Sequence, residues 1–208
     1  MEVYKYGNDQ ASIVLIQMVG EHDLSIIKQE IVEIQKLTEM KFQFIAIKVN
    51  SWNHDLSPWN ASAVFGSEGF GDGAEHTLKE VLQLCTDSKK TYCIGGYSMA
   101  GLFALWAACK TDRFAAIASA SPSIWFPGFL NYMKQQKMQS DCIYLSLGNK
   151  EEKTRNPMMK QIGDCIREAY AWFNEEGIQC TLEWNQGGHF KEPHVRTAKA
   201  FAWIMKNI

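Results

Sequence analysis

Ser98 lies inside a cluster of small residues, in the segment GGYSMAG at 95–101. A serine that attacks a substrate from a sharp strand-to-helix turn needs small residues two positions away on both sides, because strand and helix come close there. Gly96 and Ala100 occupy those positions. Such a turn also aims the backbone N–H of Met99 at the substrate, at a helix N-terminus that favours negative charge. The motif predicts a nucleophile with one oxyanion donor, although a glycine-rich turn without chemistry would read the same way.

A serine hydroxyl needs a general base to attack near neutral pH. His189 follows the last apolar strand pattern, in the turn NQGGHF, where Gly187 and Gly188 let the loop bring a ring over the sheet. We therefore expect His189 to be the base. The other histidines are His22, His54, His76 and His194. We expect them to lie at the surface, in a helix cap or within a helix, and their spacing does not favour a metal site.

The base in turn needs an acid to orient it. Glu151 and Glu152 both follow the apolar strand pattern 142–147, in the loop GNKEEK, ahead of a helix that Asn156 caps. Two solvated glutamates near a helix N-terminus would give the same pattern, because negative charge is mildly favourable there. We favour Glu151 as the acid, with Glu152 as the alternative.

The elements that must position these residues alternate between strand and helix patterns. Short apolar runs predict strands at 12–19, 41–49, 91–97, 114–120, 142–147 and 178–184, with a further edge strand at 2–6. Amphipathic or apolar helical spacing predicts helices at 24–37, 74–85, 99–110, 128–136, 157–176 and 193–207. This alternation predicts the α/β class: one domain over residues 1–208, a three-layer α/β/α sandwich with a mostly parallel sheet.

Two connections in this pattern are candidates for the rest of the site, since ligands bind beyond the carboxyl ends of parallel strands. VGEHD at 19–23 follows the first long strand, so Gly20 or Glu21 is expected to supply the second oxyanion donor. The aperiodic connection 50–73 is rich in aromatic residues, which disordered segments lack. Trp52, Asn53 and Trp59 of this connection, with the aromatic pair Trp125 and Phe126, predict a substrate pocket. The alternative is that these side chains only pack the loop on the sheet.

Composition narrows the class of protein. The chain is 46% hydrophobic and 21% charged, as in soluble globular proteins, and its net charge of −2 offers no basic field for nucleic acid. We see no secretory signal pattern and no apolar run long enough to cross a bilayer. The six cysteines form no CxxC pair, which favours a reduced, metal-free protein in the cytoplasm.

The order serine, acid, histidine, each after a successive strand, is that of the α/β-hydrolases. More narrowly, the chain resembles the small bacterial esterases grouped with esterase D and the siderophore esterases. Four segments carry the resemblance: GGYSMAGLFALW, SASPSIWFPGF at 119–129, SLGNKEEKTRNP at 146–157 and GGHF at 187–190. It implies that Ser98, His189 and Glu151 or Glu152 hydrolyse carboxylic esters through an acyl-enzyme, without a cofactor. Trp125 and Phe126 would lie near the substrate.

Two features depart from that family. Ala100 replaces the usual glycine of the serine turn, and the region after SPS at 121–123 is short, so we expect little or no separate lid. The 50–73 connection would then form the pocket wall. The expected partner is a small-molecule ester, with no nucleic acid or membrane, and the oligomeric state stays open. Alternative functions are an acyltransferase or thioesterase with the same residues, or a binding protein without catalysis.

Overall fold

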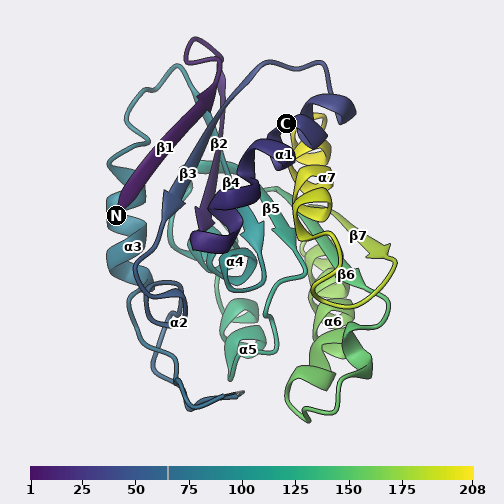
Figure 1. The fold of residues 1–208 in the computed structure, drawn as a ribbon. Helices are drawn as coiled ribbons and strands as arrows, with labels where there is room; N and C mark the ends of the chain where they lie inside the picture. The colour runs from purple at the N-terminus through teal and green to yellow at the C-terminus, as the bar shows by residue number, and fades with distance from the viewer. Residues whose placement is uncertain (65) are drawn as a thin grey trace.

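The computed structural model describes residues 1–64 and 66–208. Their strands form a seven-stranded sheet in the order β1-β3-β2-β4-β5-β6-β7 (Figure 1). The strands are β1 (Glu2–Gly7), β2 (Ile13–Val19), β3 (Phe42–Lys48), β4 (Thr91–Tyr97), β5 (Phe114–Ala120), β6 (Cys142–Gly148) and β7 (Gln179–Asn185). Only β1 runs antiparallel to its neighbour, β3, and the other pairs are parallel. The predicted mostly parallel sheet is confirmed.

Burial explains why these segments form strands. Every residue of β2 is buried, as are most of β3 to β6, because helices cover both faces of the sheet. Parallel sheets of this kind require near-continuous apolar strands. The edge strands β1 and β7 are more exposed and more polar.

Two layers of helices cover the sheet. One face packs against α1 (Glu21–Leu37) and α7 (Pro193–Met205). The other packs against α3 (Ala74–Leu82), α4 (Met99–Lys110) and α6 (Ile162–Glu175), together with the short α5 (Phe129–Lys134). The remaining helical pieces are α2 (Trp52–Asp55) and two 3₁₀ turns, η1 (Glu151–Lys153) and η2 (Met159–Gln161). No helix among the described residues combines the length and apolarity that crossing a bilayer demands.

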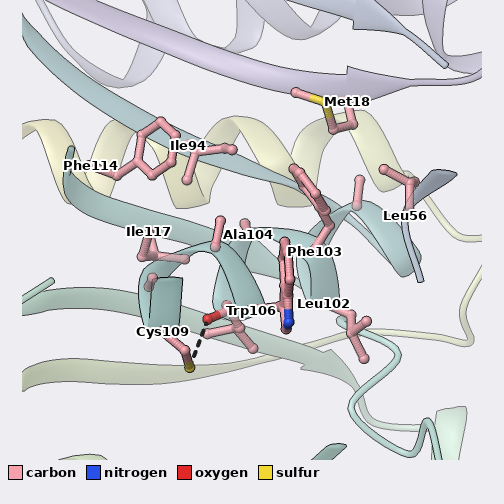
Figure 2. Packing of buried hydrophobic residues seen from close by; sticks show 14 of the residues in the cluster. Met18, Leu56, Ile94, Leu102, Phe103, Ala104, Trp106, Cys109, Phe114 and Ile117 are labelled. Carbon is pink, nitrogen blue, oxygen red and sulfur yellow. Dashed lines mark hydrogen bonds between the residues drawn. The ribbon is translucent and has the colours of Figure 1, made fainter. Parts of the chain in front are cut away.

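Helix α4, which follows Ser98, lies at the centre of the larger core. Its residues from Met99 to Cys109 are all buried, as expected for a helix that is apolar on every side. Figure 2 shows Phe103 and Trp106 on this helix among Met18, Ile94 and other core residues. Truncating Phe103, which has no exposed surface, would cost about 3–5 kcal/mol of stability. The turn before α4 is therefore fixed by a rigid element.

Two helices begin three or more residues away from their predicted first residues. Helix α6 begins at Ile162 rather than 157, since residues 159–161 form a 3₁₀ turn. The Asn156 side chain still caps this segment by accepting hydrogen bonds from the N–H groups of Met158 and Met159. Helix α1 begins at Glu21 rather than 24. The aperiodic connection 50–73 contains the short α2 and an isolated antiparallel bridge between Ala61 and Phe70.

Candidate active site

Ser98 occupies a strained turn between β4 and α4. Its backbone angles, φ 58° and ψ −119°, cost on the order of 1–3 kcal/mol in a non-glycine residue. Two main-chain hydrogen bonds hold it there: its N–H donates to Ala120 O at 3.2 Å, and its carbonyl accepts from the Ser123 N–H at 3.0 Å. A Cβ on Gly96 would lie 2.5 Å from the Ala100 Cβ. The Ala100 methyl therefore fits because Gly96 has no side chain.

A chain of hydrogen bonds joins Ser98, His189 and Glu151. Ser98 Oγ lies 3.1 Å from His189 Nε2, and His189 Nδ1 lies 2.7 Å from Glu151 Oε2. Each of the three follows a different parallel strand, namely β4, β7 and β6. The structure thus brings together three residues that the sequence placed on separate loops.

Glu152, the alternative acid, lies elsewhere. Its carboxylate accepts hydrogen bonds from Arg167 of α6, at 2.8 and 3.1 Å, on the exposed side of the 3₁₀ turn. Glu151, by contrast, is only 9% exposed. The structure pairs Glu151 with His189 and directs its neighbour to a surface ion pair.

The Glu151 carboxylate is unusually well supplied with donors. Besides His189 at Oε2, its Oε1 accepts from the Gly148 N–H at 2.7 Å, from Ser121 Oγ at 2.9 Å and from Arg196 Nη1 at 2.8 Å. Burial by itself raises the pKa of Glu151, but the hydrogen bonds from His189, Gly148 and Ser121 outweigh it and leave that pKa below its usual value. The carboxylate is therefore held in its charged form.

Arg196 belongs to this network and was missed by sequence reasoning. It is 2% exposed, on the face of α7 that packs against the sheet. Its Nη1 also lies 3.0 Å from the Tyr97 hydroxyl, and its Nη2 donates to the carbonyls of Gln186 and Gly188. The sequence does place Arg196 four residues before Ala200, at helical spacing with the apolar residues of α7, and this position indicates a buried arginine.

Ser123 is a second residue that sequence reasoning missed. Its Oγ lies 3.1 Å from Ser98 Oγ, and it is 2% exposed. It belongs to the SPS segment that follows β5, so its place after a parallel strand was the available signal.

A cavity of about 580 Å³ opens beside Ser98. Its apolar wall is made by Trp52, Trp125, Met159 and Phe190, of which Phe190 is 91% exposed. The remaining lining residues are polar or belong to the serine turn: Asn53, Glu68, Ser98, Met99, Ser123 and His189. Three of the expected pocket residues, Trp52, Asn53 and Trp125, therefore line this cavity.

The other two expected pocket residues do not. Phe126 is 1% exposed and packs edge-on against Phe70, with ring centroids 5.2 Å apart. Trp59 donates its indole N–H to Pro127 O, and its ring packs at a tilt of 57° against Phe126. It lines a separate groove of about 730 Å³ that does not include Ser98. Trp125 and Phe126 are neighbours in sequence, but Trp125 lines the cavity and Phe126 lies in the core. The expectation that Phe126 and Trp59 line the pocket beside Ser98 is therefore corrected.

The expected second oxyanion donor is also revised. The Gly20 N–H donates to the Asp23 carboxylate at 2.9 Å, and so is not free for a substrate. Neither Gly20 nor Glu21 lines the cavity, and the Glu21 carboxylate pairs with Lys48 at the surface. Met99, as the first residue of α4, has an N–H with no acceptor inside the helix, and it does line the cavity.

Among the residues that the structure describes, no group of three or more histidine, cysteine, aspartate or glutamate side chains is arranged to hold a metal ion.

Comparison with solved structures identifies the architecture. An IroE-like serine hydrolase from Shewanella oneidensis superposes with a TM-score of 0.77 at 14% identity, covering 99% of this chain and 75% of that one. The siderophore hydrolase EstA from Aspergillus nidulans gives 0.70 at 19% identity, covering 97% and 85%. Acyl-protein thioesterase 2 from Zea mays gives 0.64 at 16% identity, covering 99% and 98%.

The chain has the α/β-hydrolase fold. No protein-family model and no curated protein sequence matches it. In this chain, a hydroxyl, an imidazole and a buried carboxylate stand in hydrogen-bond contact at the carboxyl edge of the sheet, beside an apolar cavity. That arrangement suits transfer of a proton from the hydroxyl to the ring as the oxygen attacks an electrophilic carbon.

Proposed function

We propose that this protein is a serine hydrolase that cleaves a carboxylic ester, with Ser98 as nucleophile, His189 as general base and Glu151 as the orienting acid. The observation that carries the proposal is the continuous hydrogen-bond chain from Ser98 Oγ through both ring nitrogens of His189 to Glu151 Oε2. The fold neighbours whose names include serine hydrolase and siderophore hydrolase add support by analogy of fold.

The reaction has two halves. Ser98 Oγ attacks the ester carbonyl while His189 Nε2 takes the hydroxyl proton, which it then gives to the leaving alcohol as the ester C–O bond breaks. Water next attacks the acyl-Ser98 carbonyl, with His189 again taking a proton, and the acid product leaves as Ser98 regains its hydrogen. Glu151 holds the imidazole in the tautomer that leaves Nε2 free to accept, and it stabilises the imidazolium.

The negative charge that develops on the carbonyl oxygen needs two donors. The first is the Met99 N–H at the start of α4. For the second we propose the side-chain amide of Asn53, which is 8% exposed, lines the cavity with Ser98 and Met99, and makes no side-chain hydrogen bond to any other described residue. A buried amide that opens only to a cavity is stabilised when a ligand oxygen enters.

The cavity indicates a substrate of moderate size with an apolar part. Its volume of about 580 Å³ lies in the range usual for small-molecule sites. Trp52, Trp125 and Phe190 offer rings against which an aromatic or aliphatic group of the ester packs. A thioester is the second candidate, since acyl-protein thioesterase 2 from maize is among the fold neighbours.

Labelling with a fluorophosphonate probe, read by intact mass, tests this function. We expect one adduct on the parent protein and none on Ser98→Ala, with strongly reduced labelling of His189→Ala. Ser123→Ala is the matched control, because it removes the neighbouring hydroxyl and leaves the proposed nucleophile in place. Folded parent protein without an adduct, or an adduct that persists in Ser98→Ala, would contradict the proposal. Matched esters and thioesters of one acyl group then separate the two substrate classes.

A further inference from the structure

We propose that Arg196 is a positioning residue, whose guanidinium holds both the Glu151 carboxylate and the main chain of the loop that bears His189. The proposal rests on the proposed function for its catalytic meaning, but its geometry stands independently. Arg196 belongs to α7, after the last strand. Its hydrogen bonds reach neither Ser98 nor the residues that line the cavity, apart from the loop that bears His189.

The two oxygens of Glu151 have different partners. Arg196 Nη1 lies 2.8 Å from Oε1, which also accepts from the Gly148 N–H and from Ser121 Oγ. Three donors on one oxygen fix the rotamer of the carboxylate and leave Oε2 for His189 Nδ1 alone. Loss of the guanidinium would remove the only cation paired with this oxygen among the described residues. Oε1 would then keep only the Gly148 and Ser121 donors, so the carboxyl group would be held less firmly against the ring.

Arg196 also binds the main chain of the loop that precedes α7. Arg196 Nη2 donates to Gly188 O at 2.9 Å and to Gln186 O at 3.2 Å, two carbonyls that flank Gly187. Gly187 has φ +101°, in the region that favours glycine, so this loop needs contacts from elsewhere to hold one conformation. His189 is the next residue after Gly188, and its own carbonyl accepts a hydrogen bond from the Tyr97 hydroxyl at 2.6 Å.

Only a planar fork makes both sets of contacts from one side chain. One edge of the guanidinium faces Glu151 and Tyr97, and the other faces the loop carbonyls. Lysine in this position would supply a charge at a single point and so could serve one side only. The charge itself is buried, because Arg196 is 2% exposed, and burial of an arginine without a paired carboxylate is strongly unfavourable. The acid and the loop are thus coupled through one buried group.

The test compares Arg196→Ala with Arg196→Lys in two measurements. Turnover of a small chromogenic ester should fall on the order of a hundredfold in Arg196→Ala, through kcat rather than KM, because misplacement of the base affects the chemical step. Methylguanidinium added at millimolar concentration should restore part of kcat by entering the vacated site. In the proton NMR spectrum, the far-downfield resonance of the His189 Nδ1 proton should be present in the parent and lost in Arg196→Ala.

Arg196→Lys distinguishes the two contacts. Its charge should keep the downfield resonance by pairing with Glu151, while kcat stays below that of the parent because the loop carbonyls lose their donor. Parental kcat in either variant, or a retained resonance in folded Arg196→Ala, would overturn the proposal. If Arg196→Ala does not fold, the kcat of Arg196→Lys decides. A parent without esterase activity would refute the proposed function, whereas the resonance would still test the positioning role.

Discussion

Two regions of the molecule each contain a buried glutamate and a buried primary amide, and these groups have different surroundings in the two regions. At the carboxyl end of the sheet these are Glu151 and Asn53, which are 9% and 8% exposed. Beneath α1 they are Glu30 and Gln17, each 3% exposed. The second pair lies between α1 and β2, away from the cavity.

The hydrogen-bond donors account for the difference between the two glutamates. Glu151 accepts from four groups, and its pKa lies below the usual value even though burial acts to raise it. Glu30 accepts one hydrogen bond, from Gln17 Nε2 at 3.3 Å, and burial raises its pKa well above the usual value. Among the described residues, Glu30 Oε1 and Gln17 Oε1 have no partner.

Burial alone therefore does not decide whether a carboxyl group is charged. The number of hydrogen-bond donors around the carboxyl group decides its charge, and the region with many donors is the proposed active site. Beneath α1 the surroundings favour the neutral form of Glu30, whereas at the strand ends the donors favour the charged form of Glu151.

The largest effect is expected for Glu151→Gln. A glutamine keeps the shape but presents a neutral amide to His189 and leaves the buried Arg196 cation unpaired. We expect kcat/KM for a chromogenic ester to fall roughly 10³- to 10⁴-fold, as when the acid of a comparable triad becomes an amide. Glu152→Gln is the matched control and should stay within about twofold of the parent, because Glu152 is in a surface ion pair with Arg167. Equal rates for both variants would remove the distinction between the two glutamates.

The next effect concerns the two amides. Asn53→Ala should lower kcat on the order of a hundredfold or more, with little change in KM, if its amide binds the oxyanion. Gln17→Met removes the amide beneath α1 and should leave kcat at the parental value, although it changes stability. Steady-state kinetics on the same ester measures both variants. An unchanged kcat in Asn53→Ala would leave a main-chain N–H, such as that of Glu21 expected from the sequence, as the second donor.

The smallest effect is on stability, in Glu30→Gln. The pKa of Glu30 is raised in the folded state, so the folded protein binds the proton more tightly than the unfolded chain does. Its contribution is complete below the unfolded pKa, near 4.5, and is lost as the pH rises toward the folded pKa. Glutamine mimics the protonated acid, so the variant should gain on the parent by about 1.4 kcal/mol per pH unit in that window. Urea unfolding at pH 5 and at neutral pH measures the gain, and a difference that does not vary with pH would argue that Glu30 is charged in the fold.

Much of the fold could be predicted from the sequence, because buried parallel strands leave continuous apolar runs such as those at 12–19 and 142–147. The position of Ser98 followed from the same pattern, since it comes just after such a strand, and His189 follows the more polar last strand, β7. The choice between Glu151 and Glu152 could not be derived in this way. It depends on Arg167 and Arg196, which approach the two adjacent residues from different helices.

The pocket was less predictable for a related reason. Trp125 and Phe126 have the same character in sequence, and only packing against Phe70 and Trp59 assigns Phe126 to the core. The Gly20 N–H is not available to a substrate, because Asp23, three residues later, accepts its hydrogen bond. Local partners of this kind leave no periodic signal.

The separation in sequence between the partners of the site has a consequence for how the chain folds. His189 and Ser98 are 91 residues apart, Arg196 and Tyr97 are 99 apart, and Glu151 and His189 are 38 apart. Such non-local contacts form late, because loop closure must precede the contacts that compensate for it. The serine turn can form early with its neighbouring helix, but His189 reaches it only after β6, β7 and α7 have docked. A refolding chain should thus regain its helical signal before it regains the proposed reactivity toward a fluorophosphonate, and that reactivity would report completion of the whole sheet.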